Sequence, residues 1–267
     1  MRNCFLLLIC CSILLGILTG CRGDIPFVHS DEEVLIPGDN KAPVTGFFLL
    51  NEGNMGSNKA TIDFFNYETG KYMRNIYPSR NPDVVKELGD VGNEIAVYGD
   101  KLYAVINCSH YVEVMDVHTA KHIGSIDILN CRYIVFNKGK AYISSYAGPV
   151  QIDPNSRPGK VVEVDTASLQ ITREVVVGYQ PEEMVVTDGK LYVANSGGYR
   201  YPNYDTTVSV IDLETFKVIN TIDVAINLHR MAIDRYGRIY VSSRGDYYNV
   251  GADVYVIDSK KDKVLGN

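Results

Sequence analysis

Tyrosine, asparagine, arginine and glycine are concentrated in a few polar segments of this chain, and together these side chains could bind a large polar ligand. Tyrosine is unusually frequent, with 19 Tyr against 8 Phe and no Trp. A tyrosine ring offers a stacking surface and a hydroxyl, asparagine offers hydrogen-bond donors and acceptors, and arginine offers donors. We predict that the ligand-binding residues are Asn107, Arg132, Tyr133, Tyr146, Tyr179, Gln180, Asn195, Tyr199, Arg200, Tyr201, Tyr204, Asn227, His229, Arg230, Arg244 and Tyr247.

The sequence offers little that could support catalysis. It has no metalloprotease helix motif, Gly-x-Ser-x-Gly elbow or phosphate-binding loop, and its 5 histidines show no metal-ligand spacing. His229 is the best single candidate for a ligand or acid–base role, but a lone histidine beside Arg230 at a strand start is more often a structural hydrogen bonder. Glu182 and Glu183 are adjacent, and adjacent residues on a strand point to opposite faces, so they are not a ready acid–base pair. We predict no catalytic residue, no metal site and no enzymatic activity.

An internal repeat positions these residues. Each copy has a glycine turn followed by an apolar strand that contains tyrosine, and then an alternating strand that ends in aspartate. The four aspartates are 49, 47 and 46 residues apart, at Asp116, Asp165, Asp212 and Asp258. A weaker fifth copy begins at Gly46. A repeat of 40 to 50 residues made of four strands is typical of a propeller blade, whereas a β-sandwich lacks such self-similarity.

The sequence therefore predicts an all-β fold, a β-propeller of four-stranded antiparallel blades over residues 46–267. For the blade around Asp212, we expect strands at 183–187, 190–195, 207–212 and 218–224. About five blades are present. The chain ends inside the outer strand of the last one, so we expect this blade to be incomplete and the propeller to be truncated.

The two ends of the blades differ in composition. The turns between the first and second strands and between the third and fourth have ordinary hairpin chemistry. The loops at the opposite end, between the second and third strands and between successive blades, hold the Tyr, Asn, Arg and Gly residues. A single face that carries these residues in all five copies is typical of a binding face, although longer loops with turn-capping residues would also account for part of the pattern.

The N-terminus has the layout of a lipoprotein signal. An apolar run from Phe5 to Leu18 is followed by Thr19, Gly20 and Cys21. The run is shorter than the ~20 residues that a membrane-spanning helix needs. We expect residues 1–20 to be a signal peptide, Cys21 to carry lipid, and residues 21–45 to link the anchor to the fold.

Only Cys108 and Cys131 then remain in the mature fold, and an exported compartment permits a disulfide between them; the sequence leaves this pairing open. The formal net charge of -6, with no large basic cluster, argues against nucleic acid as a partner.

Two sets of segments resemble known families. The segments 189–195 and 208–212 resemble YncE-like, surface-layer-type propellers. The loop strings 51–61, 144–149, 178–183 and 195–200 resemble BtuG-type surface lipoproteins of gut bacteria. That resemblance implies a seven-bladed parent fold that captures cobalamin and passes it to a TonB-dependent transporter of the BtuB type. It also implies a lipid-anchored protein, exposed on the outer membrane, with cobalamin as a bound ligand rather than a cofactor.

This chain departs from the BtuG-type pattern because it has fewer blades, and the contact residues of that family are not mapped onto it. Two alternatives remain. Tyrosine stacking with hydrogen bonds from asparagine and arginine is also how proteins hold sugars, which makes a glycan-binding surface lipoprotein the main alternative. A propeller hydrolase or lactonase is the other, although it would need clustered acidic metal ligands.

Overall fold

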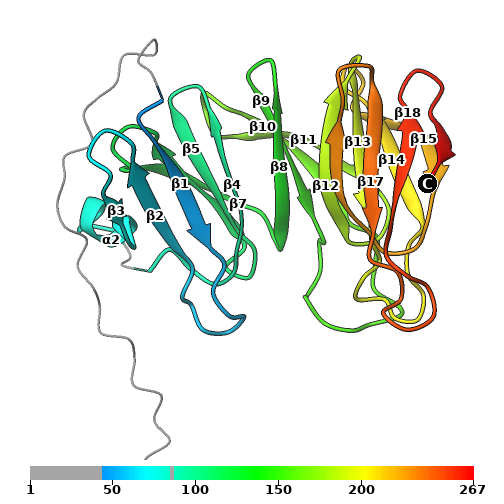
Figure 1. Cartoon of the computed structure of the whole chain (residues 1–267), viewed down its shortest axis with the longest axis horizontal. Coiled ribbons are helices and arrows are strands. Elements are labelled where there is room, and N and C mark those ends of the chain that lie inside the picture. Colours follow the sequence, from blue (N-terminus) through cyan, green and yellow to red (C-terminus); the bar gives the residue numbers. More distant parts are fainter. Residues whose placement is uncertain (1–43, 85–86) are drawn as a thin grey trace, which may run out of the picture.

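The computed structural model describes residues 44–84 and 87–267, which form five antiparallel β-sheets. The predicted signal peptide 1–20, the lipid site Cys21 and residues 21–43 of the predicted linker lie outside the described residues. Figure 1 shows that the sheets follow one another across the molecule in sequence order, from blue to red. The protein has the predicted all-β architecture of propeller blades, and one short helix lies within these described ranges.

Four of the sheets have four strands each, which we call a, b, c and d in sequence order. The bounds are β4 (Gly92–Tyr98), β5 (Lys101–Ile106), β6 (Tyr111–Asp116) and β7 (His122–Asp127); β8 (Cys131–Asn137), β9 (Lys140–Ser145), β10 (Lys160–Asp165) and β11 (Ile171–Val176); β12 (Pro181–Thr187), β13 (Lys190–Asn195), β14 (Thr207–Asp212) and β15 (Lys217–Asp223); β16 (Leu228–Ile233), β17 (Arg238–Ser243), β18 (Asp253–Asp258) and β19 (Lys263–Gly266).

The sheet at the other end of the row has three strands, β1 (Gly46–Asn51), β2 (Thr61–Asn66) and β3 (Tyr72–Met73). Strand β1 contacts β4 of the next sheet in the same way that β5 contacts β8, so β1 corresponds to a b strand. After β3 comes α2 (Ile76–Arg80), a helix that the sequence analysis did not anticipate.

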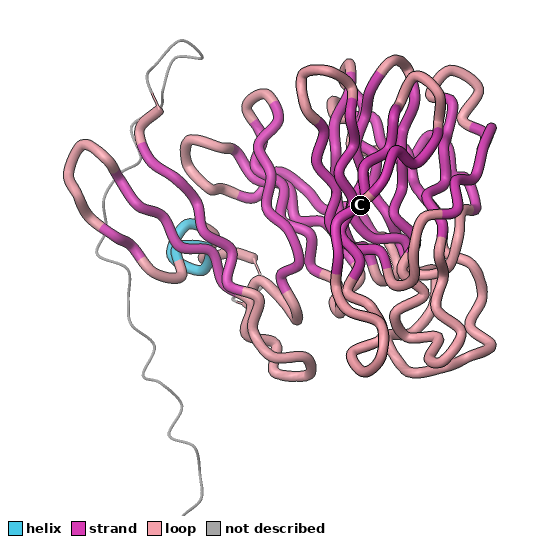
Figure 2. The backbone as a smooth tube through the Cα atoms, turned by 45° about the vertical axis from the view of Figure 1, so that its right-hand side comes forward, coloured by secondary structure: helices cyan, strands magenta, loops and turns pink. Residues whose placement is uncertain are grey.

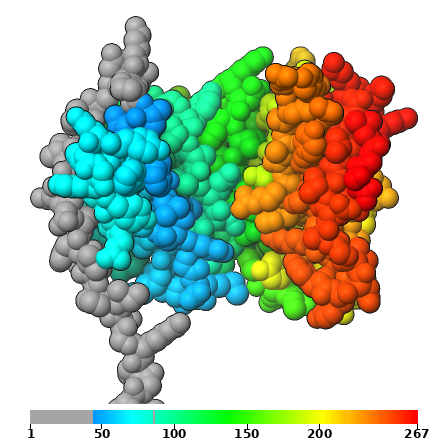
Figure 3. All heavy atoms as spheres, in the orientation of Figure 1, coloured from blue at the N-terminus to red at the C-terminus, as the bar shows by residue number. Residues whose placement is uncertain are grey.

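The chain ends inside the outer strand of the C-terminal sheet, as the sequence predicts. The sheet has all four strands, because Lys263–Gly266 pairs with β18, but this outer strand has only 4 residues, whereas β15 has 7. The first and last sheets form the two ends of the row (Figure 3).

The repeated aspartates end the c strands for a local chemical reason. The Asp212 carboxylate accepts hydrogen bonds from the backbone N–H and the hydroxyl of Thr215, both at 2.7 Å. Asp116 accepts the same two bonds from Thr119, both at 2.8 Å. Such side-chain bonds to a following backbone N–H favour a turn over further strand.

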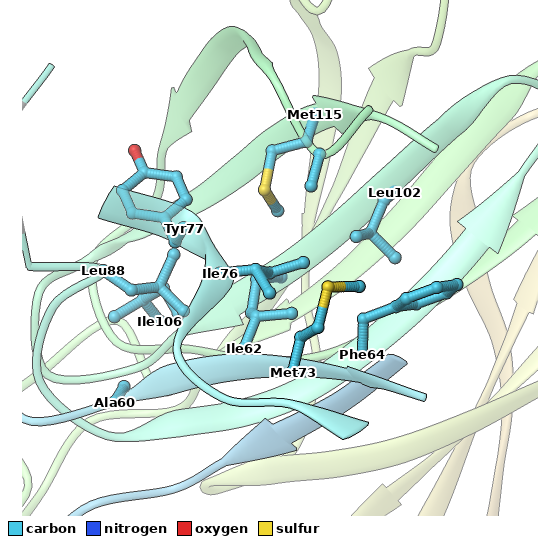
Figure 4. Packing of buried hydrophobic residues seen from close by; sticks show 12 residues of the cluster. Ala60, Ile62, Phe64, Met73, Ile76, Tyr77, Leu88, Leu102, Ile106 and Met115 are labelled. Carbon is cyan, nitrogen blue, oxygen red and sulfur yellow. The ribbon is translucent and has the colours of Figure 1, made fainter. Parts of the chain in front are cut away.

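The core lies between neighbouring sheets and is built mainly from the b and c strands, with some residues of the a strands, such as Ile134 and Met184. In the first cluster, Ile62 and Met73 of the first sheet pack with Leu102, Ile106 and Met115 of the second (Figure 4). Ile62, Ile106 and Met115 are fully buried, and full burial of a side chain of this size contributes about 1.5 to 3 kcal/mol. The d strands lie at the periphery, where most side chains are exposed.

The loops gather at one end of the blades, as the sequence predicts. Figure 2 shows the long connections together below the strands, and they include residues 52–60, 146–159, 196–206 and 244–252. We call this end the b–c loop face. The a strands begin on it, and neighbouring a strands contact one another along β4, β8, β12 and β16.

Candidate functional site

Each a strand carries a β-bulge near its start, and the bulges bring polar side chains to the b–c loop face. The register with the b strand shifts between Gly92 and Glu94, between Cys131 and Ile134, between Pro181 and Met184, and between Leu228 and Met231. A bulge lets two residues oppose one and re-aims their side chains. The residue pairs at these points are Asn93 and Glu94, Arg132 and Tyr133, Glu182 and Glu183, and His229 and Arg230.

Side chains from three blades meet around these bulges. We call the group the inner-strand cluster, and it consists of Arg132, Tyr133, Tyr146, Glu182, His229, Arg230 and Arg244. The Arg132 guanidinium donates two hydrogen bonds to Glu182 Oε2, from Nε at 3.1 Å and from a terminal nitrogen at 3.0 Å. The side chains of Arg132 and Glu182 are 13% and 1% exposed, so this is a buried ion pair.

Tyr146 forms a hydrogen bond with the other oxygen of the Glu182 carboxylate. Its hydroxyl donates to Glu182 Oε1 at 2.6 Å, and the Arg132 guanidinium carbon lies 4.9 Å from the centre of its ring. Burial, together with the negative charge of Glu182, raises the pKa of Tyr146 well above its ordinary value. The phenol therefore stays protonated and acts as a donor. A buried charge is tolerated only when it is paired and hydrogen-bonded in this way.

His229 is neutral in this environment. Burial lowers its pKa to about 4, and the nearby Arg244 and Arg230 charges act in the same direction, against Glu182. Its Nε2 lies 2.8 Å from the Tyr133 hydroxyl and 2.6 Å from an Arg244 terminal nitrogen. Because arginine can only donate, Nε2 must be the acceptor, and the ring proton lies on Nδ1.

Glu94 and Glu183 link neighbouring a strands. Glu94 Oε2 accepts the backbone N–H of Ile134, and Glu183 Oε2 accepts that of Met231, both at 2.6 Å. Burial raises the pKa of Glu94 to about 7, although its hydrogen bond from Ile134 acts in the opposite direction. These two carboxylates therefore satisfy backbone donors of β8 and β16, which are edge strands of their own sheets.

Residues just before the a strands hold the loops in place. Asn130, Gln180 and Asn227 have left-handed φ angles of 44°, 46° and 54°. The Asn227 side chain donates to the carbonyl of Gly245 at 3.0 Å, and the Gln180 side chain donates to Ser156 Oγ at 3.1 Å. Each of these two side chains fastens a crossover to the b–c loop of a blade beside it.

Gly197 lets the loop 196–206 fold back on itself. It has a φ of +54°, and a Cβ there would lie 2.2 Å from the backbone nitrogen of Asp205. The Asp205 carboxylate then accepts the backbone N–H of Tyr179 at 2.7 Å, which joins the loop to the preceding crossover.

Two cavities open on the b–c loop face. One, of about 290 Å³, lies beside blade β8–β11 and is lined by Tyr146, Gly148, Pro149, Gln151, Asp153, Asn155, Ser156, Arg157 and Gln180. The other, of about 600 Å³, lies between the last two blades and is lined by Tyr201, Pro202, Asn203, Tyr204, Ile226, Asp246, Tyr248 and Asn249.

The structure divides the predicted binding residues into four sets. The inner-strand cluster contains Arg132, Tyr133, Tyr146, His229, Arg230 and Arg244. Beside it lie Tyr179, Gln180, Tyr199 and Arg200, with the Arg200 guanidinium carbon only 3.6 Å from the centre of the Tyr179 ring. At the outer rim, Tyr201 and Tyr247 are 49% and 67% exposed, with Tyr204 beside Tyr201.

The fourth set, Asn107, Asn195 and Asn227, is almost fully buried, with exposed fractions of 1%, 0% and 0%. The Asn195 side chain donates to the hydroxyls of Thr207 and Ser209, and Asn107 donates to the carbonyl of Cys131 at 2.9 Å. These asparagines hold the strands and loops that present the other residues.

Cys108 and Cys131 are both free thiols among the described residues. Cys131 is fully buried, and its Sγ lies 3.3 Å from the carbonyl of Tyr111, whereas Cys108 is half-buried in the turn after β5. The disulfide that the sequence left open is therefore not formed.

Sequence reasoning did not select three functional carboxylates, Glu94, Glu182 and Glu183. It treated the last two only as neighbours that cannot form an acid–base pair, and the structure gives them different partners, Arg132 and Arg230. An alignment of the four repeats on their a strands could have found them, because it places two consecutive polar residues at the same point of each copy.

The family comparison covers nearly all of the described fold. The sequence profile of the family described as "Domain of unknown function (DUF5074)" matches residues 45–265. The chain belongs to this DUF5074 family. Its matched region contains all five sheets, so in this protein the DUF5074 region is a set of propeller blades. A search of curated proteins found no match for it.

Solved structures similar to this DUF5074 protein agree with the fold. Hydrazine synthase from Kuenenia stuttgartiensis superposes with a TM-score of 0.57 and 18% sequence identity, over 66% of this chain and 48% of that chain. BamB from Moraxella catarrhalis superposes with a TM-score of 0.51 and 14% identity, over 81% of this chain and 63% of that one. The DUF5074 chain thus spans about half to two thirds of these structures, which are similar to it in fold.

Within the described ranges, no group of three or more His, Cys, Asp or Glu side chains is arranged to hold a metal ion. The same part of this DUF5074 protein contains no helix that is long and apolar enough to cross a membrane.

Proposed function

We propose that this protein is a non-catalytic binding protein that holds a small polar ligand, a corrinoid such as cobalamin, on its b–c loop face. The observation that carries the proposal is the placement of both cavities, the exposed tyrosines and the inner-strand cluster on this one face. A concave surface with aromatic rings and a few fixed polar groups is the usual form of a small-molecule site.

The chemistry of the face suits a corrinoid. A corrin ring is broad and is rimmed by amide side chains, so it needs both flat contact surface and hydrogen-bond partners. Tyr201 and Tyr247 supply exposed rings, while Arg230 supplies donors with a side chain that is 55% exposed. The loop strings that resemble BtuG-type proteins supply the second line of support.

The cellular role that we propose follows from the sequence. Lipid on Cys21 would anchor the protein to the outer membrane, exposed at the cell surface, where it would pass its ligand to a TonB-dependent transporter of the BtuB type. The net charge of -6 supports a partner other than nucleic acid.

A titration of the protein with cyanocobalamin, followed by visible absorbance, tests the proposal. We expect saturable binding without conversion of the ligand. Tyr179→Ala should weaken it by about 1 to 3 kcal/mol, the range for aromatic anchors at interfaces. Lys217→Ala is the control, because Lys217 is exposed at the start of β15, at the opposite end of the blades.

Three results would overturn the proposal. Absence of heat with cobalamin together with saturable binding of an oligosaccharide would identify a glycan-binding protein instead. Turnover of any ligand would restore the hydrolase alternative. Equal loss of affinity in the Tyr179 and Lys217 variants would place the corrinoid on another surface.

A further inference from the structure

Three guanidinium groups gather near the Tyr133 phenol. The guanidinium carbons of Arg132 and Arg230 lie 5.7 and 4.8 Å from the centre of its ring. Arg244, the first residue of the loop after β17, reaches the same place, since it shares His229 Nε2 with the Tyr133 hydroxyl. Like charges this close repel one another in a partly desolvated site unless anions balance them.

The nearest carboxylates are Glu182 and Glu183. Arg132 pairs closely with Glu182, whereas Arg230 and Arg244 are paired only weakly. Glu182 is occupied by the two hydrogen bonds of Arg132 and by the Tyr146 hydroxyl, so Arg244 comes only within 4.0 Å of it. Arg230 lies 3.5 Å from Glu183, whose other oxygen already accepts the Met231 N–H. In contrast to Arg132, the Arg230 and Arg244 side chains are 55% and 35% exposed and can reach a ligand.

His229 and Glu94, the remaining titratable neighbours, do not balance the positive charge of the three arginines. His229 has one acceptor lone pair at Nε2 and two donors directed at it, so Arg244 and Tyr133 compete for it. Glu94, with a pKa raised to about 7 by burial, supplies only part of a negative charge at neutral pH. Within the described residues, the cluster therefore has three guanidinium groups facing the carboxylates of Glu182 and Glu183 and a partly protonated Glu94.

We propose that Arg230 and Arg244 together bind an oxyanion, the phosphate ester or carboxylate group of the ligand. A guanidinium presents its donors in a planar fork that matches both kinds of oxyanion, and it binds either more strongly than it binds neutral acceptors. The inference deepens the proposed function and, for a corrinoid, rests on it: the phosphodiester of the cobalamin nucleotide would be the group that these two arginines hold.

Inorganic phosphate is the first probe. The His229 ring signals are followed by NMR during titration of the protein with phosphate at low ionic strength, and binding is also measured by calorimetry. We expect saturable binding that raises the His229 pKa from about 4, since an added negative charge stabilises the imidazolium form. Acetate replaces phosphate in a second titration, which separates a phosphate site from a carboxylate site, and either one supports the proposal.

Arg230→Gln and Arg244→Gln should each weaken phosphate binding about fivefold, the effect of losing one partly exposed charge pair of about 1 kcal/mol. Arg235→Gln is the matched control, because Arg235 is exposed in the a–b turn at the opposite end of the same blade. Melting temperatures confirm that the variants fold. If Arg244→Gln does not fold, Arg230→Gln and the charge-preserving Arg244→Lys carry the test, the latter with an affinity between those of wild type and Arg230→Gln, because lysine keeps the charge but not the planar fork.

Corrinoid titrations keep this inference separate from the proposed function. If it is right, the two Gln variants weaken binding of cobalamin but not of cobinamide, which lacks the nucleotide phosphodiester. Unchanged cobalamin binding in both variants would overturn the oxyanion site while leaving the proposed function in place. Phosphate binding in a protein that binds no corrinoid would overturn the proposed function and support the site. No effect of phosphate or acetate on His229 would refute the site directly.

Discussion

Glu182→Gln should destabilise the protein far more than the same change at an exposed ion pair. Glu182 and Arg132 are 1% and 13% exposed, so loss of the carboxylate charge leaves a guanidinium in a site that water hardly reaches. Removing one partner of a buried pair costs about 3 to 5 kcal/mol, and we expect about 3 because the glutamine amide keeps one acceptor oxygen. For a fold of this size, that corresponds to a melting temperature about 10 °C lower.

The assay is urea unfolding of the variant beside Glu174→Gln. Glu174 pairs with Lys160 at 2.6 Å, but these side chains are 59% and 30% exposed, so this control should lose at most about 1 kcal/mol. Glu182 accepts three hydrogen bonds from Arg132 and Tyr146 in a buried site, whereas Glu174 accepts one from Lys160 at the surface, so the comparison separates a buried ion pair from an exposed one. Equal losses in the two variants would refute the reasoning that the Arg132–Glu182 pair is isolated from solvent.

Three further predictions concern neighbouring parts of the fold. The folded-state pKa of Glu94, about 7, lies above its ordinary value of 4.5, so the free energy of unfolding should fall as the pH rises from about 4.5 to about 7. Glu94→Gln should remove this fall, about 3 kcal/mol, in urea titrations across that range. An alkylating thiol reagent should label Cys108 well before Cys131, since burial raises the pKa of Cys131 to about 12. Mass spectrometry of timed samples measures the order of labelling, and earlier labelling of Cys131 would contradict its burial. Asn227→Ala should lower the free energy of unfolding by about 2 kcal/mol, because it loses the hydrogen bond to Gly245 and places alanine at a left-handed φ. Asn227→Gly should lower it by only about 1 kcal/mol, because glycine accepts this φ and only the hydrogen bond is lost. Equal losses in thermal melts would argue against backbone strain at this position.

The blades were predictable because their signals are local. For the blade around Asp212, the expected strands 190–195 and 207–212 match β13 and β14 residue for residue, and 218–224 is shifted by one residue from β15. Alternating apolar residues, glycine turns and the aspartate bonds to the following backbone are all encoded within a few positions. The a strand was expected from 183 but begins at Pro181, because the bulge interrupts the alternation there.

The binding face was predictable only in outline. Topology alone places the b–c loops together, but burial decides which side chains face a ligand, and burial depends on neighbouring blades. In the sequence, nothing distinguishes Asn107 and Asn195 from exposed asparagines. Both side chains are nevertheless buried in the structure. The pairing of Arg132 with Glu182, 50 residues apart, is a non-local event that no short window of sequence contains.

The bulges at the starts of the a strands give the fold a modular design. Each blade contributes two adjacent side chains at the same point, and in four blades these are Asn93 and Glu94, Arg132 and Tyr133, Glu182 and Glu183, and His229 and Arg230. The apolar core of the b and c strands does not depend on which residues fill these positions. Exchanging these residue pairs, with buried partners such as Arg132 and Glu182 changed together, would therefore give the same scaffold a different ligand preference, so that specificity could be engineered, or could evolve, a few positions at a time.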